Sequence, residues 1–484
     1  MSREADKTRK NIIVIFIGQL LLGLITALSY KLMVGYVGAE EGGLIVYSIA
    51  LLNSLRALFD LGLAKTVIKY IAENRDIREK LVNVCQYFTA IYGLIFILLM
   101  ISVTLFSHDI SMFFFSGTEF NSALGGWHVF LYAAPIILII SYLSSVLAGF
   151  ERFVVVSLVD LLVGVLLYAL SAALLVSGVS FSNIAVVIVS LYLLKMTLFL
   201  GCCVKRVGWG FLLPKYKSVF HHEVKGHMRN MFLLSGLLFV HKQADKLVVG
   251  KLLAISDAGF YVIIFSLIGK LSILTQSISQ ALSPQFSKGK HEESRLKYLK
   301  LSRFNLGFMM PIYIGAAIVM DEILVFLLGN EFPKEYLYCA YAVILYFFLN
   351  AAIRLFRTLL ISRSGSSLVL KADVFGVVLS FPLLIVSAFY YGIIGVCVSM
   401  LVFYLVMIPV LVVGGYQKVL DSSPVSWLNQ VIEVSKLPFL FAIPIVGYKY
   451  IYDVPAYQDI LLAMTFGLIC FVVLYRDWCG SRKL

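Results

Sequence analysis

The sequence is poor in charged residues. Of its 484 residues only 14% are Asp, Glu, Lys or Arg, whereas 61% are hydrophobic. A soluble globular chain has roughly a quarter charged and about half apolar residues. The mean hydropathy of +0.94 agrees with this imbalance. The composition excludes a water-soluble enzyme, a disordered scaffold and a secreted domain.

Cysteine and the motifs of cofactor sites are also scarce. The predicted topology places no two of the seven cysteines in extracytoplasmic loops, and their spacing is not that of zinc ligands. No glycine-rich phosphate loop occurs, and no soluble segment is long enough for an ATPase. We therefore expect no catalytic residue, no metal and no cofactor. Active transport would then draw on an ion gradient, with proton or sodium left open, or on consumption of the product.

Long apolar runs are what the sequence has in abundance. A helix needs about 20 apolar residues to cross roughly 30 Å of hydrocarbon. Solid apolar runs such as residues 133–140 exclude a barrel of alternating strands, so we predict an all-α polytopic membrane protein. Fourteen stretches qualify as spans: 11–33, 44–70, 82–106, 127–149, 153–177, 183–204, 230–252, 259–283, 304–328, 336–361, 368–389, 392–415, 437–452 and 457–475.

The loops between these stretches alternate in charge. Most of the 40 basic residues lie in the two termini and in every second loop, including residues 205–229 and 288–303. The other loops, such as 106–126, are acidic or uncharged on balance. Because Lys and Arg are retained in cytoplasmic loops, we expect both termini in the cytoplasm.

The longest basic loop suggests a division into two halves. We predict an N-terminal lobe at 1–204, a cytoplasmic linker at 205–229, a C-terminal lobe at 230–416, and an extra pair of spans with the tail at 417–484. Six spans in each half make the halves parallel repeats. Two such lobes would enclose a central cleft, as an alternating-access transporter requires.

The remaining basic residues fall inside predicted spans. An ionisable side chain in a span is costly and is a functional hypothesis by default, although one near a helix end can reach the headgroups. We expect the side chains of Lys31, Lys69, Arg357 and Lys449 to reach the headgroups in this way. For Lys65 both interpretations stay open. The deeper polar residues are the candidate substrate-binding set: Arg56, Lys195, Lys242, Lys246, Lys270, Asn350 and Arg354.

Only three acids lie at comparable depth, namely Asp60, Asp160 and Asp245. Arg56 and Asp60 are four residues apart on one helical face, so a structural ion pair is an alternative there. Asp60 and Asp245 are also the candidates for proton or cation coupling. Since the bases outnumber the acids, we expect a cationic, water-accessible cleft and an anionic passenger such as a phosphate ester.

Two segments resemble the signatures of a known family. Residues 58–63, Leu-Phe-Asp-Leu-Gly-Leu, and residues 244–251, continuing through Gly259-Phe260-Tyr261, are similar to bacterial polysaccharide flippases of the multidrug/oligosaccharidyl-lipid/polysaccharide exporter superfamily. The resemblance implies a flippase that moves an undecaprenyl-diphosphate-linked oligosaccharide, of the O-antigen type, from the cytoplasmic to the periplasmic leaflet of the bacterial inner membrane. The resemblance carries over to four candidate residues: Asp60, Asp245 and Lys246 lie within these segments, and Arg56 lies two residues before the first of them.

Three alternatives stay open. Fourteen spans are also typical of lipid II flippases of the same superfamily. A cation-coupled multidrug antiporter has the fold but would need the opposite cleft charge. An integral-membrane glycan polymerase or acyltransferase usually has a large outer loop. The longest outer loop here, residues 106–126, holds no Lys or Arg and one His.

The expected partners are the lipid-linked glycan, membrane lipids and other polysaccharide assembly proteins, and no nucleic acid.

Overall fold

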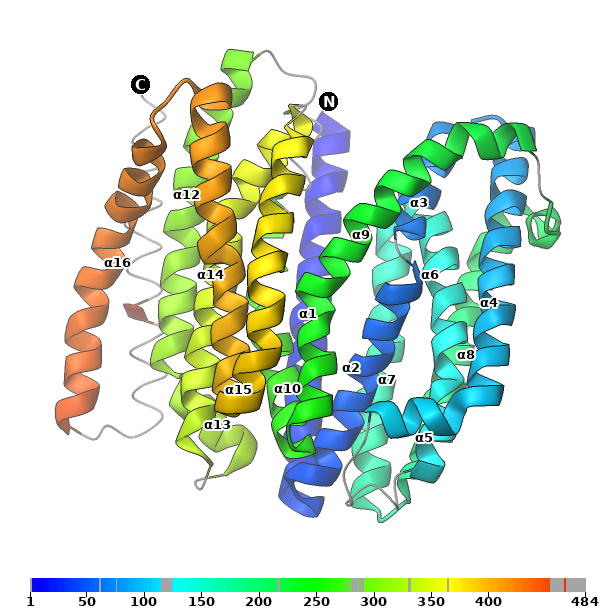
Figure 1. Cartoon of the computed structure of the whole chain (residues 1–484), viewed down its shortest axis with the longest axis horizontal. Coiled ribbons are helices and arrows are strands. Elements are labelled where there is room, and N and C mark those ends of the chain that lie inside the picture. The colour runs from blue at the N-terminus through cyan, green and yellow to red at the C-terminus, as the bar shows by residue number, and fades with distance from the viewer. Residues whose placement is uncertain are drawn as a thin grey trace. The chain divides into compact units, whose positions relative to one another are not determined.

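The computed structural model is built of helices. It describes residues 2–60, 62–74, 76–114, 124–215, 218–273, 275–276, 278–279, 286, 291–329, 332–363, 365–452 and 465–466, and no β-strand occurs among them. In chain order the helices are α1 (Ser2–Val37), α2 (Ala39–Asp60), α3 (Leu63–Asn74), α4 (Arg78–Phe114), α5 (Leu124–Leu131), α6 (Ala133–Gly149), α7 (Phe153–Val176), α8 (Phe181–Val207), η2 (Trp209–Leu212), α9 (Ser218–Leu252), α10 (Ile255–Leu271), α12 (His291–Ile318), α13 (Met320–Leu328), α14 (Lys334–Ser362), α15 (Ser366–Leu420) and α16 (Pro424–Tyr452) (Figure 1).

The helices are those of a membrane protein. Eight described helices are long and apolar enough to cross a bilayer. Their outward faces are apolar too: Leu94, Ile97 and Leu105 are exposed on α4, as are Phe375 and Val378 on α15. Rows of exposed large hydrophobic side chains at helical spacing need an apolar solvent, so these faces contact lipid. The predicted all-α polytopic membrane fold is confirmed.

The chain divides into two compact units, residues 1–263 and 264–484. In the first unit α6 is central, because it packs against α2, α3, α4 and α8. In the second unit α14 is central and packs against α12 and α15, while α16 packs against α12. The boundary between the units falls within α10, so α9 packs with the first unit. The assignment of six spans to each lobe stays a prediction.

The predicted second span is wrong as a single helix. Residues 44–70 belong to two helices, because α2 ends at Asp60 and α3 begins at Leu63. Gly62 has a φ of +85°, a conformation that costs an L-residue energy and costs glycine none. The break therefore follows from one glycine in an otherwise apolar run. It places Asp60 at the end of a helix rather than in the middle of one.

The predicted linker is partly helical. Residues 205–229 include the end of α8, the short helix η2, and the first turns of α9 from Ser218 onward. The segment has enough helix-forming residues to extend the following span by three turns, and α9 continues without interruption to Leu252.

Residues 368–389 and 392–415, predicted as two spans, are two arms of α15. Gly392 between them has a φ of +55°, and the chain reverses direction there (Figure 1). The hydroxyl of Ser387 donates a hydrogen bond of 2.8 Å to the carbonyl of Gly395 across the reversal. Both predicted spans are confirmed as helical arms.

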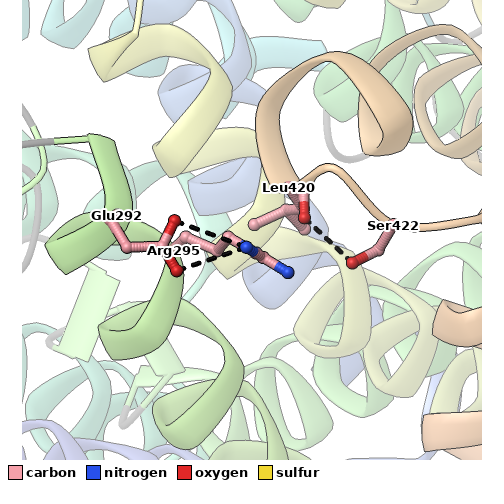
Figure 2. A network of polar contacts seen from close by, with 4 residues as sticks. All are labelled: Glu292, Arg295, Leu420 and Ser422. Atoms are coloured by element: carbon pink, nitrogen blue, oxygen red, sulfur yellow. Dashed lines mark hydrogen bonds and ion pairs between the residues drawn. The ribbon is translucent and has the colours of Figure 1, made fainter.

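The second unit collects polar side chains at one end of its helices. Arg295 on α12 pairs with Glu292 one turn earlier, with an N–O distance of 3.2 Å, and extends in the view of Figure 2 toward the last residues of α15. There the Ser422 hydroxyl donates to the Leu420 carbonyl at 2.9 Å. The start of α12 and the end of α15 thus lie at the same end of the unit, as the charge alternation of the loops predicts.

The last helix holds the thirteenth predicted span. Residues 437–452 lie within α16, which contains Pro438 and Pro444 and begins at Pro424. The fourteenth predicted span, residues 457–475, lies outside the described residues except for residues 465 and 466.

Candidate functional site

The α2–α3 break is organised around the carboxylate of Asp60. The buried hydroxyl of Tyr92 on α4 donates to Oδ1 at 2.8 Å, and the hydroxyl of Ser141 on α6 donates to the same oxygen at 3.2 Å. The backbone N–H of Ala64, in the first turn of α3, donates to Oδ2 at 3.4 Å. Asp60 therefore joins the end of α2 to α3, α4 and α6. Its contact with α3 is a cap, at a helix N-terminus that favours negative charge.

Arg56 does not form the ion pair with Asp60 that its spacing suggests. It is half-buried one turn before Asp60, and no ion pair joins the two among the described residues. Its charge instead acts on the hydroxyl groups of the buried Tyr92 and Tyr192. Arg56 is a basic side chain in a span, and no carboxylate of the described residues pairs with it.

Lys195 is neutralised within the first unit. Its Nζ lies 2.7 Å from Oδ1 of Asp160, across the α7–α8 contact, and the Lys195 side chain is only 18% exposed. The same ammonium lies 6.0 Å from the centre of the Phe199 ring. This pairing gives Lys195 a structural role between two helices and leaves less of its charge for a passenger.

The basic residues of α9 lie beside α2. Lys246 Nζ donates to Oε1 of Gln243 at 2.8 Å and to the carbonyl of Lys242 at 3.1 Å. The same Gln243 oxygen accepts a 2.9 Å hydrogen bond from the hydroxyl of Ser54 on α2. Lys242 is exposed and Lys246 is half-buried. The structure thus brings Lys246 and the middle of α2 together through one glutamine.

Asp245 is the most deeply buried of the predicted acids, with 1% of its surface exposed. The hydroxyl of Tyr261 on α10 donates to Oδ2 at 2.5 Å. Oδ1 has no hydrogen-bond partner among the described residues. The backbone N–H groups of residues 245 and 246 lie close by, but both belong to the interior of α9, where the helix uses them.

Arg354 lies in the second unit near tyrosine hydroxyls. Its charge interacts with Tyr313 on α12, Tyr346 on α14 and Tyr404 on α15, and is repelled by Arg357 one turn later. Its Nε is buried without a hydrogen-bond partner, and no carboxylate pairs with the guanidinium among the described residues. Asn350, one turn earlier on α14, is half-buried. A buried guanidinium whose Nε has no partner among the described residues has a donor to offer an anion.

Arg357, one turn beyond Arg354, corrects the sequence interpretation. Rather than reaching the headgroups, its Nη2 lies 2.7 Å from Oδ2 of Asp373 on α15, which is 1% exposed. Sequence reasoning missed Asp373 as a deep acid because it lies close to the start of its apolar run. The basic Lys371 two residues earlier gives that stretch the composition of a loop.

The candidate residues fall into two groups. Lys270, in the last turn of α10, lies with Asn350 and Arg354 in the second unit, and the other candidates lie in the first. A single cleft lined by both groups stays a prediction. Among the residues that the structure describes, no cluster of three His, Cys, Asp or Glu side chains could hold a metal ion.

Comparison with known proteins identifies the family. Residues 32–337 match the model of a family described as polysaccharide biosynthesis protein, which is more than half of the chain. The chain belongs to this family. The matched range includes all candidate residues of the first unit and Lys270, whereas Asn350 and Arg354 lie beyond it.

A Shigella flexneri protein named for O-antigen transport is 22% identical over 329 residues, which cover 65% of this chain and 75% of that protein. Among solved structures, the lipid II flippase MurJ in an inward closed conformation is similar with a TM-score of 0.67 and 14% identity, covering 96% of this chain and 99% of MurJ. An inward-facing multidrug resistance MATE transporter of the MOP superfamily is similar with a TM-score of 0.62 and 12% identity, covering 87% and 99%. The chain thus combines membership of the polysaccharide biosynthesis protein family with the fold of these solved transporters.

Proposed function

We propose that this protein moves an undecaprenyl-diphosphate-linked oligosaccharide of the O-antigen type from the cytoplasmic to the periplasmic leaflet of the bacterial inner membrane, by alternating access. Both termini lie in the cytoplasm, and an ion gradient drives the cycle. The protein positions and moves the lipid-linked glycan and catalyses no covalent step.

The observation that carries this proposal is the contrast between paired and unpaired bases inside the helices. Lys195 and Arg357 each have a carboxylate at 2.7 Å, but Arg56 and Arg354 have none among the described residues. An uncompensated guanidinium in a span is stabilised when an anion binds to it, and a diphosphate fits its bidentate donors. The polyprenyl tail can stay in lipid while the phosphate groups contact these bases.

The experiment is genetic. Deleting the gene is expected to trap the lipid-linked sugar units on the cytoplasmic face and to abolish surface polysaccharide. Complementation with Arg56→Ala or Arg354→Ala is expected to restore about 10–100-fold less transport than the wild type, because a hydrogen bond to a charged group contributes about 1.5–3 kcal/mol. Arg56→Lys and Arg354→Lys retain the charge and are expected to lie in between.

Arg303→Ala is the matched control. Arg303 lies on α12 with 63% of its side chain exposed and pairs with Glu433, so its removal deletes the same charge at a solvated surface. Full complementation by this variant shows that the loss is specific to the buried arginines. Normal surface polysaccharide in the deletion strain would contradict the proposal. Accumulation of the peptidoglycan precursor instead would identify a lipid II flippase.

A further inference from the structure

The two segments that resemble the family signatures lie far apart in sequence and pack against each other. One is the α2–α3 segment, and the other runs along α9 into α10, both within the first unit. We name their contact the α2–α9–α10 seam. It is formed by Gly43, Tyr47, Ser54 and Gly62 on one side, and by Met231, Ser235, Gln243, Gly250 and Gly259 on the other.

Glycine makes this seam unusually close. A Cβ on Gly259 would lie 2.2 Å from the Cα of Gly43, and a Cβ on Gly250 would lie 1.7 Å from the hydroxyl oxygen of Tyr47. At the other end a Cβ on Gly62 would lie 2.7 Å from the carbonyl oxygen of Met231. In lipid no hydrophobic force drives helices together. Small residues let two helix backbones approach closely, and the resulting van der Waals packing stabilises the contact.

Asp245 is buried in the middle of this close contact. It lies on α9 two residues from Gln243, which binds α2, and its carboxylate accepts from Tyr261 on α10. The ionisable groups around it are Lys246 and the buried His241, one turn earlier, on its own helix, together with Tyr261 on α10 and Tyr47 on α2. Lys246 directs its Nζ to Gln243 and the Lys242 carbonyl. A carboxylate with one free oxygen in so dry a position is disfavoured in its charged form.

We propose that Asp245 is a proton-binding site that holds the α2–α9–α10 seam closed, and that the seam opens when the proton leaves. The proposal rests on the proposed function for its physiological meaning only, since the proton site and the seam can be measured without the glycan. It selects Asp245 over Asp60 as the coupling group.

The direction of the coupling follows from solvation. In the closed seam the protonated carboxyl loses little solvation free energy, because an uncharged oxygen tolerates an apolar contact. The charged carboxylate gains water only if the seam separates. The closed state therefore binds the proton more tightly than the open state does, so closing takes up one proton and opening releases one.

The test measures how fast a cysteine in the seam reacts. Ser54, which is fully buried on α2 beside Gln243, is replaced by cysteine in a full-length chain whose seven native cysteines are replaced. The labelling rate with N-ethylmaleimide, which crosses membranes, is followed in proteoliposomes between pH 5.5 and 8. The same measurement is made with Asp245→Asn added, which mimics the protonated carboxyl.

The ratio of the two rates is the readout, because the reactivity of the thiol itself also rises with pH and cancels in the ratio. We expect the labelling rate of the protein with Asp245, divided by that of the Asp245→Asn protein, to rise with pH. For one proton the rise is at most about tenfold per pH unit. A ratio that stays constant with pH would overturn the proposal. So would an Asp245→Asn protein that labels faster than the parent at high pH.

Hydrogen–deuterium exchange of peptides from α9 and α10 provides a second measurement if the cysteine-free chain does not fold. With the native cysteines retained, exchange in residues 244–263 is expected to be faster at pH 8 than at pH 5.5, after correction for intrinsic rates, and to be independent of pH in Asp245→Asn. Equal pH responses in the two proteins would contradict the proposal. Failure of the proposed function would show in complementation, while this pH response would remain.

Discussion

The α2–α3 break and the α9–α10 region both combine a glycine contact with an aspartate in the membrane, yet they treat the aspartate differently. Asp60 accepts hydrogen bonds from three helices, and its two oxygens both have donors. Asp245 is more deeply buried, and among the described residues its carboxylate accepts a side-chain hydrogen bond at one oxygen only, from Tyr261. On the proposal above, deeper burial together with fewer donors makes Asp245 the group that changes its protonation state, whereas Asp60 is a structural anchor.

The largest expected effect extends this rule to an ion pair in the second unit. Arg357→Ala removes the guanidinium that neutralises Asp373, which is 1% exposed. Leaving a buried charge without its partner costs about 3–5 kcal/mol. We expect a marked drop in the thermal unfolding midpoint of the purified protein in detergent. The control is Arg354→Ala, which orphans no carboxylate and should impair transport while changing that midpoint little.

Asp60→Ala should have the next largest effect. It leaves the fully buried hydroxyl of Tyr92 without its acceptor and removes the joint between α2, α3, α4 and α6. An unsatisfied buried polar group costs about 1–3 kcal/mol, so the unfolding midpoint should fall. Asp245→Asn, in contrast, replaces a carboxyl that is protonated in the closed seam by a neutral amide, and should leave the midpoint unchanged or raised. Equal losses in both variants would remove the distinction between the two regions.

Gly259→Ala tests the close contact itself. Its methyl group would lie 2.2 Å from the Gly43 Cα, and backbone cannot turn aside as a side chain can, so we expect a cost of about 1–3 kcal/mol from overpacking. The matched control is Gly236→Ala on α9, where no atom lies within 4 Å of the added methyl. That variant should be neutral or slightly stabilising. Both are measured by thermal unfolding and by the labelling rate of Ser54→Cys, which only Gly259→Ala should increase.

The smallest expected effect is that of Tyr261→Phe, which removes the single hydroxyl donor of Asp245. One hydrogen bond to a charged group contributes about 1.5–3 kcal/mol, and one to a neutral group about 0.5–1.5 kcal/mol. If Asp245 is protonated in the closed seam, the loss of stability should lie in the range for a neutral group and should grow as the pH rises. A loss that is large at pH 5.5 and independent of pH would indicate a permanently charged Asp245.

Much of the fold was predictable from composition alone. The apolar runs predicted helices in α1, α4, α7 and α14, because a run of that length in lipid has no other way to satisfy its backbone. The error in the second span came from a single residue, because Gly62 divides a run that looks continuous.

The candidate site was predictable in kind but not in pairing. Periodicity placed Arg56 and Asp60 on one face, but it could not show that Tyr92 and Ser141 from other helices satisfy the carboxylate first. Likewise, nothing in the sequence linked Lys195 to Asp160 or Arg357 to Asp373, since each pair joins residues on different helices or helical arms. Those contacts depend on how helices cross, which no local pattern encodes.

By itself the sequence determined that this protein is a helical membrane protein. It also determined that basic residues gather in every second loop and outnumber acidic residues within the spans. Apolar length and charge bias act locally, so they can be read residue by residue. The tertiary structure alone decided which bases are neutralised, and that two distant motifs meet in one glycine seam. Those outcomes depend on distances between helices, where an ångström separates a hydrogen bond from an unpaired charge.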